Sequence, residues 1–286
     1  MSKTPAQKRE FEAPLLLDRY RPLVALARGG MSVVFQGRDE VLGRDVAIKV
    51  FSAGGEDDVE RYREELRMLA SLSHHGVVAI IDAGIDLSTP DDPRPFLVME
   101  LVRGRTLRKT IAKKELSTQA IGELGFEIAE TLEYVHARGV VHRDVTPSNI
   151  MLVDYGTQSS RPRARLTDFG IATDVIASPN SKGETTGTAA YLSPEQALNQ
   201  PVGPPGDIYA LGLVLLECFT RELAFPGDAI PSAVKRLTDD PPIPASVPAD
   251  WAALIREMTD RDPEKRPTAA AVAERARSTL RRASVD

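Results

Sequence analysis

The chain has 286 residues, 42% hydrophobic and 27% charged, which is typical of a globular protein with one large domain or two lobes. Its formal net charge of −5 argues against a nucleic-acid-binding protein, which would carry a basic excess. The single cysteine, Cys218, excludes an intrachain disulfide and favours a reducing, cytoplasmic location, with the thiol as a buried packing group.

The two ends of the chain and its most apolar run show no membrane segment. Residues 1–19 are expected to form a flexible leader, because they begin with a polar stretch that lacks an apolar signal core. The run Ile208–Phe219 is too short to cross a bilayer and contains Glu217, so it is expected to be a buried helix. Residues 283–286 are expected to be a short tail.

The first part of the chain is rich in strand patterns. Short apolar and β-branched runs between turn signals predict strands at 23–26, 32–35, 46–51, 77–81 and 96–99. A helix is expected at 56–72, because Leu66, Leu69 and Leu72 recur every three residues on one face. The proline-containing stretch 88–95 is expected to be a loop.

After Gly104 the patterns become helical. Helices are expected at 117–138, 207–220, 251–258 and 268–282. Ser117 is the expected N-cap and Gly139 the C-cap of the first of these helices. The proline- and glycine-rich run 201–206 is expected to be a loop, and 155–165 the tip of an extended hairpin.

This order of elements predicts an α+β protein with two lobes. Residues 20–99 would form a small β-rich N-terminal lobe with one key helix. Residues 100–104 would form a hinge, and residues 105–282 a larger, mostly helical C-terminal lobe.

Three features of the expected N-terminal lobe point to phosphate binding. Gly29 and Gly30 lie between two strands, where backbone N–H groups could approach phosphate oxygens, although a tight hairpin turn explains them equally well. Lys49 ends a strand, and Glu65 lies on the expected helix. Each alone is typical of a solvated surface. Together with the glycines they predict an ion pair that holds Lys49 toward phosphates.

A second group of residues lies in the expected C-terminal lobe. In the run His142–Asn149, Asp144 can accept a hydroxyl proton and Asn149 offers a carbonyl oxygen suited to magnesium. Asp168 follows downstream, directly before Phe169 and Gly170. Each motif alone would be explained by a surface turn. In this order, and together with Lys49, they predict phosphoryl transfer.

This set of motifs resembles the catalytic domain of the protein kinases, from about Tyr20 to Leu280. The stretches 28–32 and 187–195 are similar to those of the bacterial, eukaryotic-like Ser/Thr protein kinases. The resemblance implies a bilobal protein-kinase-like fold. It also implies transfer of the γ-phosphoryl group of ATP to Ser and Thr hydroxyls of protein substrates, with Mg²⁺, or alternatively Mn²⁺, as the metal.

The resemblance also implies a nucleotide site. Lys49 would contact the phosphates and pair with Glu65. Met99 would be the gatekeeper residue beside the adenine. The remaining residues of the nucleotide site would be Ala27, Gly29 and Gly30 over the phosphates, Glu100, Leu101 and Val102 in the hinge, and Val34, Ala47 and Met151 around the adenine.

Catalytic, metal-binding and structural roles follow in the same way. Asp144 would orient the substrate hydroxyl and take its proton, while Asn149 and Asp168 would hold the metal. Arg143 would bind a phosphorylated activation loop. The preferred autophosphorylation sites would be Thr185 and Thr186. Glu195 and Arg266 would form a buried ion pair. The residues with structural roles would be His142, Phe169, Thr188, Glu195, Asp207 and Arg266.

The chain departs from the family pattern at three positions. Ala27 and Ser32 replace two loop glycines, and Thr146 stands where a lysine is usual. The loss of that positive charge would remove transition-state stabilisation. The alternative to an active kinase is therefore a pseudokinase that acts as a nucleotide-binding interaction module. Activity is favoured because every metal and proton-transfer position is filled.

Two further expectations concern substrates and partners. A small-molecule kinase is disfavoured by the complete segment through Glu195 and by Asp207 and Arg266. Protein substrates are expected, together with self-association for autophosphorylation, and nucleic acid is not an expected partner.

Overall fold

The computed structural model of the chain describes residues 15–29, 32–51, 66, 68–86, 88, 93–156, 161–169 and 189–283. The chain divides into two compact units. The first contains the chain up to Ala70 together with Ala79–Leu101, and the second contains Ser71–Val78 and the chain from Val102 onward. Residues 71–78, predicted as part of the N-terminal lobe, belong to the second unit.

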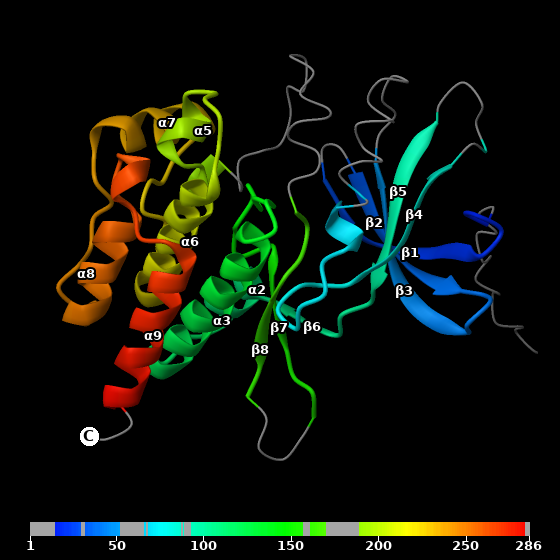
Figure 1. The fold of residues 1–286 in the computed structure, drawn as a ribbon, viewed down its shortest axis with the longest axis horizontal. Helices are drawn as coiled ribbons and strands as arrows, with labels where there is room; N and C mark the ends of the chain where they lie inside the picture. Colours follow the sequence, from blue (N-terminus) through cyan, green and yellow to red (C-terminus); the bar gives the residue numbers. More distant parts are fainter. Residues whose placement is uncertain are drawn as a thin grey trace, which may run out of the picture. The chain divides into compact units, whose positions relative to one another are not determined.

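The first unit is built on an antiparallel sheet of five strands in the order β1-β2-β3-β5-β4 (Figure 1). The strands are β1 (Tyr20–Arg28), β2 (Ser32–Asp39), β3 (Arg44–Phe51), β4 (Ile80–Asp86) and β5 (Arg94–Glu100). Because side chains alternate across a strand, each strand offers one set of residues to either face of the sheet.

One face of this sheet carries the hydrophobic core of the first unit. The cluster consists of Leu16, Tyr20, Val46, Ile48, Phe96 and Val98, each at most 5% exposed. Leu16 belongs to this core although the sequence analysis assigned residues 1–19 to a flexible leader, and Arg19 pairs with the buried Asp39 at 2.8 Å. Leu16 and Arg19 therefore belong to the folded first unit.

The second unit is mostly helical and also contains a small antiparallel sheet in the order β6-β7-β8 (Figure 1). The strands are β6 (Gly104–Thr106), β7 (Ile150–Val153) and β8 (Arg163–Leu166). The helices are α2 (Leu107–Lys113), α3 (Thr118–His136), α5 (Pro194–Ala197), α6 (Pro204–Thr220), α7 (Ala229–Thr238), α8 (Ala249–Met258) and α9 (Ala269–Ala283), with short 3-10 turns at Ala189–Tyr191 and Pro263–Lys265.

Helix α6 lies at the centre of the second unit. Every residue from Gly206 to Cys218 is buried, which explains why this run is apolar on all sides. Helix α3 packs beside it, and Trp251 on α8 lies 6.0 Å from the ring of Phe219. Burial raises the pKa of the Cys218 thiol, so the cysteine is a packing residue as expected.

Most of the predicted elements are present. Helix α3 begins at its predicted N-cap, where the Ser117 side chain accepts a hydrogen bond from the Ala120 N–H. It ends at His136 with Ala137 as its C-cap, so the prediction of Gly139 as the C-cap was wrong; Gly139 follows in the left-handed region with a φ of +74°. Strands β7 and β8 form the two arms of the predicted hairpin. Of the helix predicted at 56–72, the structure describes only 66 and 68–72, and residues 66 and 68–70 are helical.

Several boundaries differ from the prediction, and three of the differences have a clear physical reason or change an assignment. Strand β4 starts at Ile80 instead of 77, because Val77 forms an isolated parallel bridge with Leu166. Helix α6 starts inside the predicted loop 201–206, since a proline in the first helical turn loses no backbone hydrogen bond. Arg94 and Pro95 belong to β5, although 88–95 was predicted as a loop.

The short helices α2, α5 and α7 were not predicted. Helices α2 and α5, with seven and four residues, are too short to show a clear apolar repeat, whereas α7 is as long as the predicted α8 and was overlooked. None of the helices in the described part of the chain is both long and apolar enough to cross a bilayer.

Candidate active site

The face of the first unit's sheet opposite its core carries the predicted nucleotide-binding residues. Val34 pairs directly with Lys49, and Ala47 pairs with Met99. Directly opposed residues share a face, as do residues two apart on one strand, so these four side chains lie together. Ala27, which pairs with Val34, joins them. This face offers an apolar surface with one amine beside it.

The turn between β1 and β2 begins at Gly29, whose N–H donates to the Ser32 carbonyl at 2.8 Å. Two predicted partners in this unit, Gly30 and Glu65, lie outside the described residues. Glu100 ends β5, and its side chain accepts a hydrogen bond from the Ala79 N–H at 2.9 Å. Its backbone N–H donates to the Ala79 carbonyl at 3.0 Å, so the residue is held at both ends.

In the second unit, Asp207 holds the backbone of the predicted catalytic loop. Its carboxylate accepts hydrogen bonds from the N–H groups of His142 at 2.8 Å and Arg143 at 2.7 Å. The His136 ring lies 2.8 Å from the same carboxylate, and Asp207 is only 1% exposed. Arg143 has a φ of +64°, a backbone conformation that non-glycine residues rarely adopt and that needs external support.

Replacement of Asp207 by Asn tests this support. Asn keeps one acceptor oxygen, so at least one of the buried N–H groups of His142 and Arg143 would lose its partner. We expect the free energy of unfolding to fall by about 1–3 kcal/mol, measured by urea denaturation. The exposed Asp239→Asn variant is the matched control. An unchanged stability of Asp207→Asn would show that the carboxylate does not hold the loop.

The His142 ring connects this loop to the residues that precede Asp168. Its Nδ1 accepts a hydrogen bond from the Asp144 N–H at 3.3 Å, and its Nε2 lies 3.1 Å from the Thr167 carbonyl. This pattern requires the neutral tautomer with the proton on Nε2. The Phe169 ring lies 4.6 Å away, so the expected packing of His142 on Phe169 is present.

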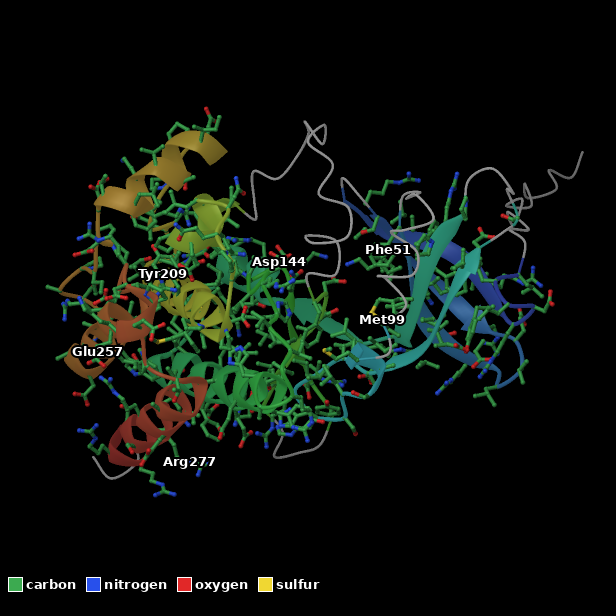
Figure 2. The ribbon with its side chains drawn as sticks, turned by 45° about the horizontal axis from the view of Figure 1, so that its top comes forward. Phe51, Met99, Asp144, Tyr209, Glu257 and Arg277 are labelled. Atoms are coloured by element: carbon green, nitrogen blue, oxygen red, sulfur yellow. The ribbon has the colours of Figure 1, made fainter. Side chains whose placement is uncertain are left out.

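Asp144 and Asn149 are directly hydrogen-bonded. The Asn149 Nδ2 donates to the Asp144 carbonyl at 3.0 Å and to its carboxylate Oδ2 at 2.7 Å. Both hydrogens of the amide are thereby used inside the loop, and the amide carbonyl oxygen is the atom that remains to bind a cation. Figure 2 shows Asp144 in the second unit.

The backbone carbonyl of Asn149 accepts a hydrogen bond from the Thr167 N–H at 2.9 Å, which brings the segment before Asp168 beside Asn149. Asp168 has a φ of +57°, a second unusual backbone conformation in this loop region. Met151 lies on β7, two residues after Asn149, and pairs with Thr106 on β6. Val102 lies two residues before β6 and is half-buried.

Thr146 lies inside the loop and is only 4% exposed. Its carbonyl accepts a hydrogen bond from the Asn149 N–H at 3.0 Å. Together with Asp144, Tyr191 and Leu192 it lines a narrow recess of the second unit. The position at which the family pattern has a lysine is therefore beside Asp144, where a charge could influence chemistry.

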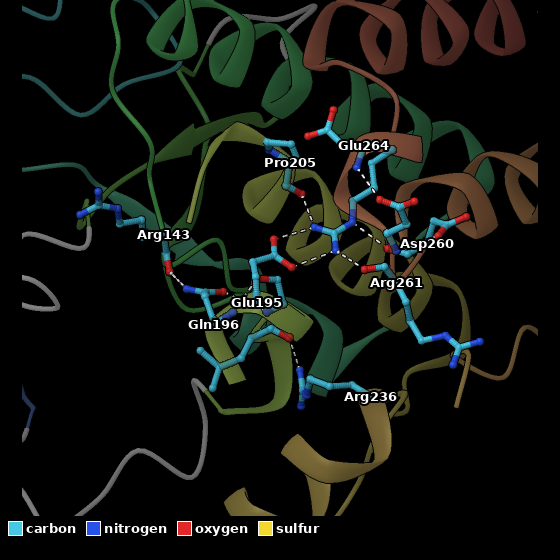
Figure 3. Close-up of polar contacts among 12 residues, drawn as sticks. Arg143, Glu195, Gln196, Pro205, Arg236, Asp260, Arg261 and Glu264 are labelled. Carbon is cyan, nitrogen blue, oxygen red and sulfur yellow. Dashed lines mark hydrogen bonds and ion pairs between the residues drawn. The ribbon is translucent and has the colours of Figure 1, made fainter. Parts of the chain in front are cut away.

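The predicted ion pair of Glu195 and Arg266 is present (Figure 3). The Arg266 guanidinium, 0% exposed, contacts the two carboxylate oxygens of Glu195 at 2.7 and 2.9 Å. Its other donors reach the carbonyls of Pro205 and Asp260 at 2.9 and 2.7 Å. Burial raises the pKa of Glu195, but the hydrogen bonds to its carboxylate and the positive charge of Arg266 together outweigh burial, so the pKa is lowered.

Two arginines that were not predicted, the buried Arg236 and the half-buried Arg108, hold the segment before Glu195. Arg236 on α7 is 0% exposed and donates to the carbonyls of Ala189, at 2.7 Å, and Leu192 (Figure 3). Its burial lowers its pKa. Arg108 on α2 contacts both Glu217 and the Tyr191 hydroxyl. An arginine on a polar helix gives no sequence signal that distinguishes it from a solvated one.

Helix α5 adds one more tie to the catalytic loop. The Gln196 side chain donates to the Arg143 carbonyl at 2.9 Å, while its carbonyl oxygen accepts from the Ser193 N–H in a capping box (Figure 3). Thr185, Thr186 and Thr188 lie outside the described residues.

Comparison with known proteins identifies the family. The family model described as the protein kinase domain matches residues 20–276 of the chain. The chain belongs to the protein kinase family. Within it, this kinase domain is 38% identical to serine/threonine-protein kinase PknB of Mycobacterium tuberculosis strain H37Ra over 263 residues. It is also 36% identical to serine/threonine-protein kinase PknA of the same strain over 258 residues.

The kinase domain covers these relatives only in part. Each alignment includes 88% of this chain, but 41% of PknB and 58% of PknA. PknB of Mycobacterium bovis shows the same 38% identity and the same 41% share. The bilobal fold implied by the sequence motifs agrees with the family and with the β-rich and helical units observed.

Proposed function

We propose that the chain is a serine/threonine protein kinase that transfers the γ-phosphoryl group of ATP to hydroxyl groups of proteins. The observation that carries the proposal is the loop in which the Asn149 amide donates a hydrogen bond to the Asp144 carboxylate. The Asp207 carboxylate holds the backbone of this loop by accepting hydrogen bonds from it. Its rigid hydrogen bonding suits a carboxylate that must receive a proton in one orientation. The printed names of PknB and PknA support the same chemistry.

In the proposed reaction Asp144 accepts the hydrogen bond of the substrate hydroxyl and then its proton as the oxygen attacks phosphorus. The Asn149 amide holds the Asp144 carboxylate in one orientation. On the sheet face of the first unit, the Lys49 amine contacts the α and β phosphates. The apolar side chains of Val34, Ala47 and Met99 on that face contact the adenine.

The donor set of the loop suits a hard divalent cation. Asn149 offers an amide carbonyl oxygen and Asp168 a carboxylate, and Mg²⁺ prefers such oxygen ligands. The hydrogen bonds of the Asn149 Nδ2 fix the amide with its nitrogen toward Asp144, which is the orientation a metal ligand needs. Magnesium, when bound, would neutralise negative charge on the transferring phosphoryl group.

The choice of serine and threonine over tyrosine rests on two sequence features. Pro147 follows Thr146 in the catalytic loop, and Gly187–Thr188 opens the segment that ends at Glu195. Both match the pattern of Ser/Thr kinases. We further propose that self-association supports autophosphorylation of the activation loop.

The test is incubation of the protein with labelled ATP, magnesium and a general acceptor such as myelin basic protein. We expect label in the acceptor with the parent protein and none with Lys49→Met. Phosphoamino-acid analysis should show phosphoserine or phosphothreonine. ATP binding without any transfer would instead establish a pseudokinase, and phosphotyrosine would contradict the proposed specificity.

Thr146 is the position at which rate could be gained. A lysine there would place a positive charge beside Asp144, where one added donor to the transferring group can be worth about 3 kcal/mol. We expect Thr146→Lys to preserve or raise the transfer rate, measured as kcat. The Thr146→Val variant controls for loss of the hydroxyl. A collapse of kcat in Thr146→Lys would reveal a role of the threonine that the family pattern does not predict.

Activation-loop phosphorylation gives a separate prediction. Thr185 and Thr186 directly precede Gly187–Thr188 in the sequence, and Arg143 in the catalytic loop would bind a phosphorylated residue. We expect mass spectrometry of the active protein to find phosphate on Thr185 or Thr186, and none after Asp144→Asn. Active protein without phosphate at either threonine would contradict this regulation.

A further inference from the structure

A cavity of about 600 Å³ lies in the second unit, lined by residues of α2, α3 and the β6-β7-β8 sheet. Figure 1 shows these elements side by side. The predicted catalytic residues Asp144, Asn149 and Asp168 do not line it. Its volume falls within the roughly 300–1,000 Å³ that small-molecule sites occupy. The cavity is therefore large enough for a ligand of its own.

The floor of this cavity is apolar. Leu124 on α3 is 4% exposed and Ala164 on β8 is 2% exposed. Leu116, Ala120, Leu152 and Pro162 complete the apolar lining. Two of these residues carry no side chain beyond Cβ, which leaves room above them. The floor could accommodate a hydrocarbon chain but no polar group that needs a partner.

The acidic side chains of the wall are neutralised by the protein itself. Glu127, 3% exposed, accepts hydrogen bonds from Arg163 and from the Ala164 N–H, both at 2.7 Å, and pairs with Arg161 at 2.9 Å. Glu123 also pairs with Arg161, at 3.1 Å. These carboxylates therefore present little net negative charge to a ligand.

Positively charged side chains other than those paired with Glu123 and Glu127 lie at the rim of the cavity. Arg105 on β6 and Lys113 and Lys114 at the end of α2 are exposed and line the cavity. Arg103 and a third carboxylate, Asp154, also line the cavity, and the Asp154 side chain accepts a hydrogen bond from the Gly156 N–H at 2.9 Å. Long cationic side chains can lay their stems on an apolar surface and keep their charged ends in water.

We propose that this cavity binds an anionic amphiphile, a molecule with a medium-length hydrocarbon chain and a carboxylate or phosphate head. The chain lies on Leu124, Leu152 and Ala164, and the head contacts Lys113, Lys114 and Arg105. The paired carboxylates Glu123 and Glu127 exclude a cationic head, because their charges are already matched within the protein. The site does not depend on the proposed kinase activity.

The test is isothermal titration calorimetry of the complete chain with decanoate, decyl phosphate, decanol and decylamine, each below its micelle concentration. We expect the two anions to bind, with decanol at least tenfold weaker and decylamine without binding. The affinities of decanoate and decyl phosphate are compared to show which anionic head the site prefers, the carboxylate of a fatty acid or a phospholipid-like phosphate. Equal affinities for decanol and the anions, or no binding by any probe, would overturn the proposal.

Two variants locate the site. Ala120→Phe fills the cavity from a half-buried position and is expected to abolish binding of decanoate. Lys113→Ala/Lys114→Ala changes only exposed side chains, so it keeps the fold, and should weaken decanoate at least tenfold. Lys235→Ala/Lys265→Ala, with exposed lysines elsewhere in the second unit, is the matched control and should bind normally. Decanoate affinity unchanged in the Lys113/Lys114 variant would refute the assignment.

Discussion

Asp144→Asn is expected to lower kcat for phosphoryl transfer by about 10²–10⁴-fold. Asn has nearly the same shape as Asp, and its amide oxygen can still accept the hydrogen bond from the Asn149 Nδ2, which spans 2.7 Å in the parent. The loop should therefore keep its conformation. What Asn lacks is a carboxylate that can take the proton of the substrate hydroxyl at neutral pH.

The measurement is steady-state transfer to a protein acceptor, beside ATP affinity from a fluorescent-nucleotide titration. We expect kcat to fall while ATP affinity stays within about twofold, because the residue acts on the hydroxyl and not on ATP. Asp239→Asn, an exposed residue on the same unit, should leave both values unchanged. An Asp144→Asn enzyme with full kcat would show that another group receives the proton.

Arg266→Met is expected to destabilise the second unit by about 3–5 kcal/mol, because it leaves the Glu195 carboxylate buried without its partner. The side chains of Arg266 and Glu195 are 0% and 9% exposed, so water cannot replace the lost hydrogen bonds. The carbonyls of Pro205 and Asp260 lose their donor as well. The free energy of unfolding from urea titrations measures the effect.

The double variant Glu195→Leu/Arg266→Met removes the buried charge and should be more stable than Arg266→Met alone. Arg256→Met, an exposed arginine on α8, is the matched control. Equal stabilities of Arg266→Met and the parent at pH 7 would contradict the role of the pair.

The same pair gives a pH dependence with a defined sign. The pKa of Glu195 is lowered below its ordinary value of 4.5 in the folded protein. Its contribution to stability is therefore complete above pH 4.5 and is lost as the pH falls through the lower folded-state pKa. The stability difference between the parent and Arg266→Met should consequently shrink in acid. A difference that grows in acid would contradict this assignment.

The amino-acid sequence by itself determined the family and predicted which residues would carry the proposed chemistry. The order and spacing of Lys49, Asp144, Asn149 and Asp168 sufficed for the family, because each motif lies within a few residues of chain. Short apolar and β-branched runs also predicted β1, β2, β3 and β5, and the amphipathic and apolar runs predicted α3, α6, α8 and α9. These patterns are local, and local patterns can be read from sequence.

The tertiary structure alone decided how those residues are held. Asp207 reaches the backbone of His142 across 65 positions of the chain, with His136 as an additional partner. Arg236 is buried against carbonyls 44 and 47 positions away, although its sequence surroundings are those of a surface residue. Such contacts depend on which helix packs against which loop, a property of the assembled core that no short sequence window contains.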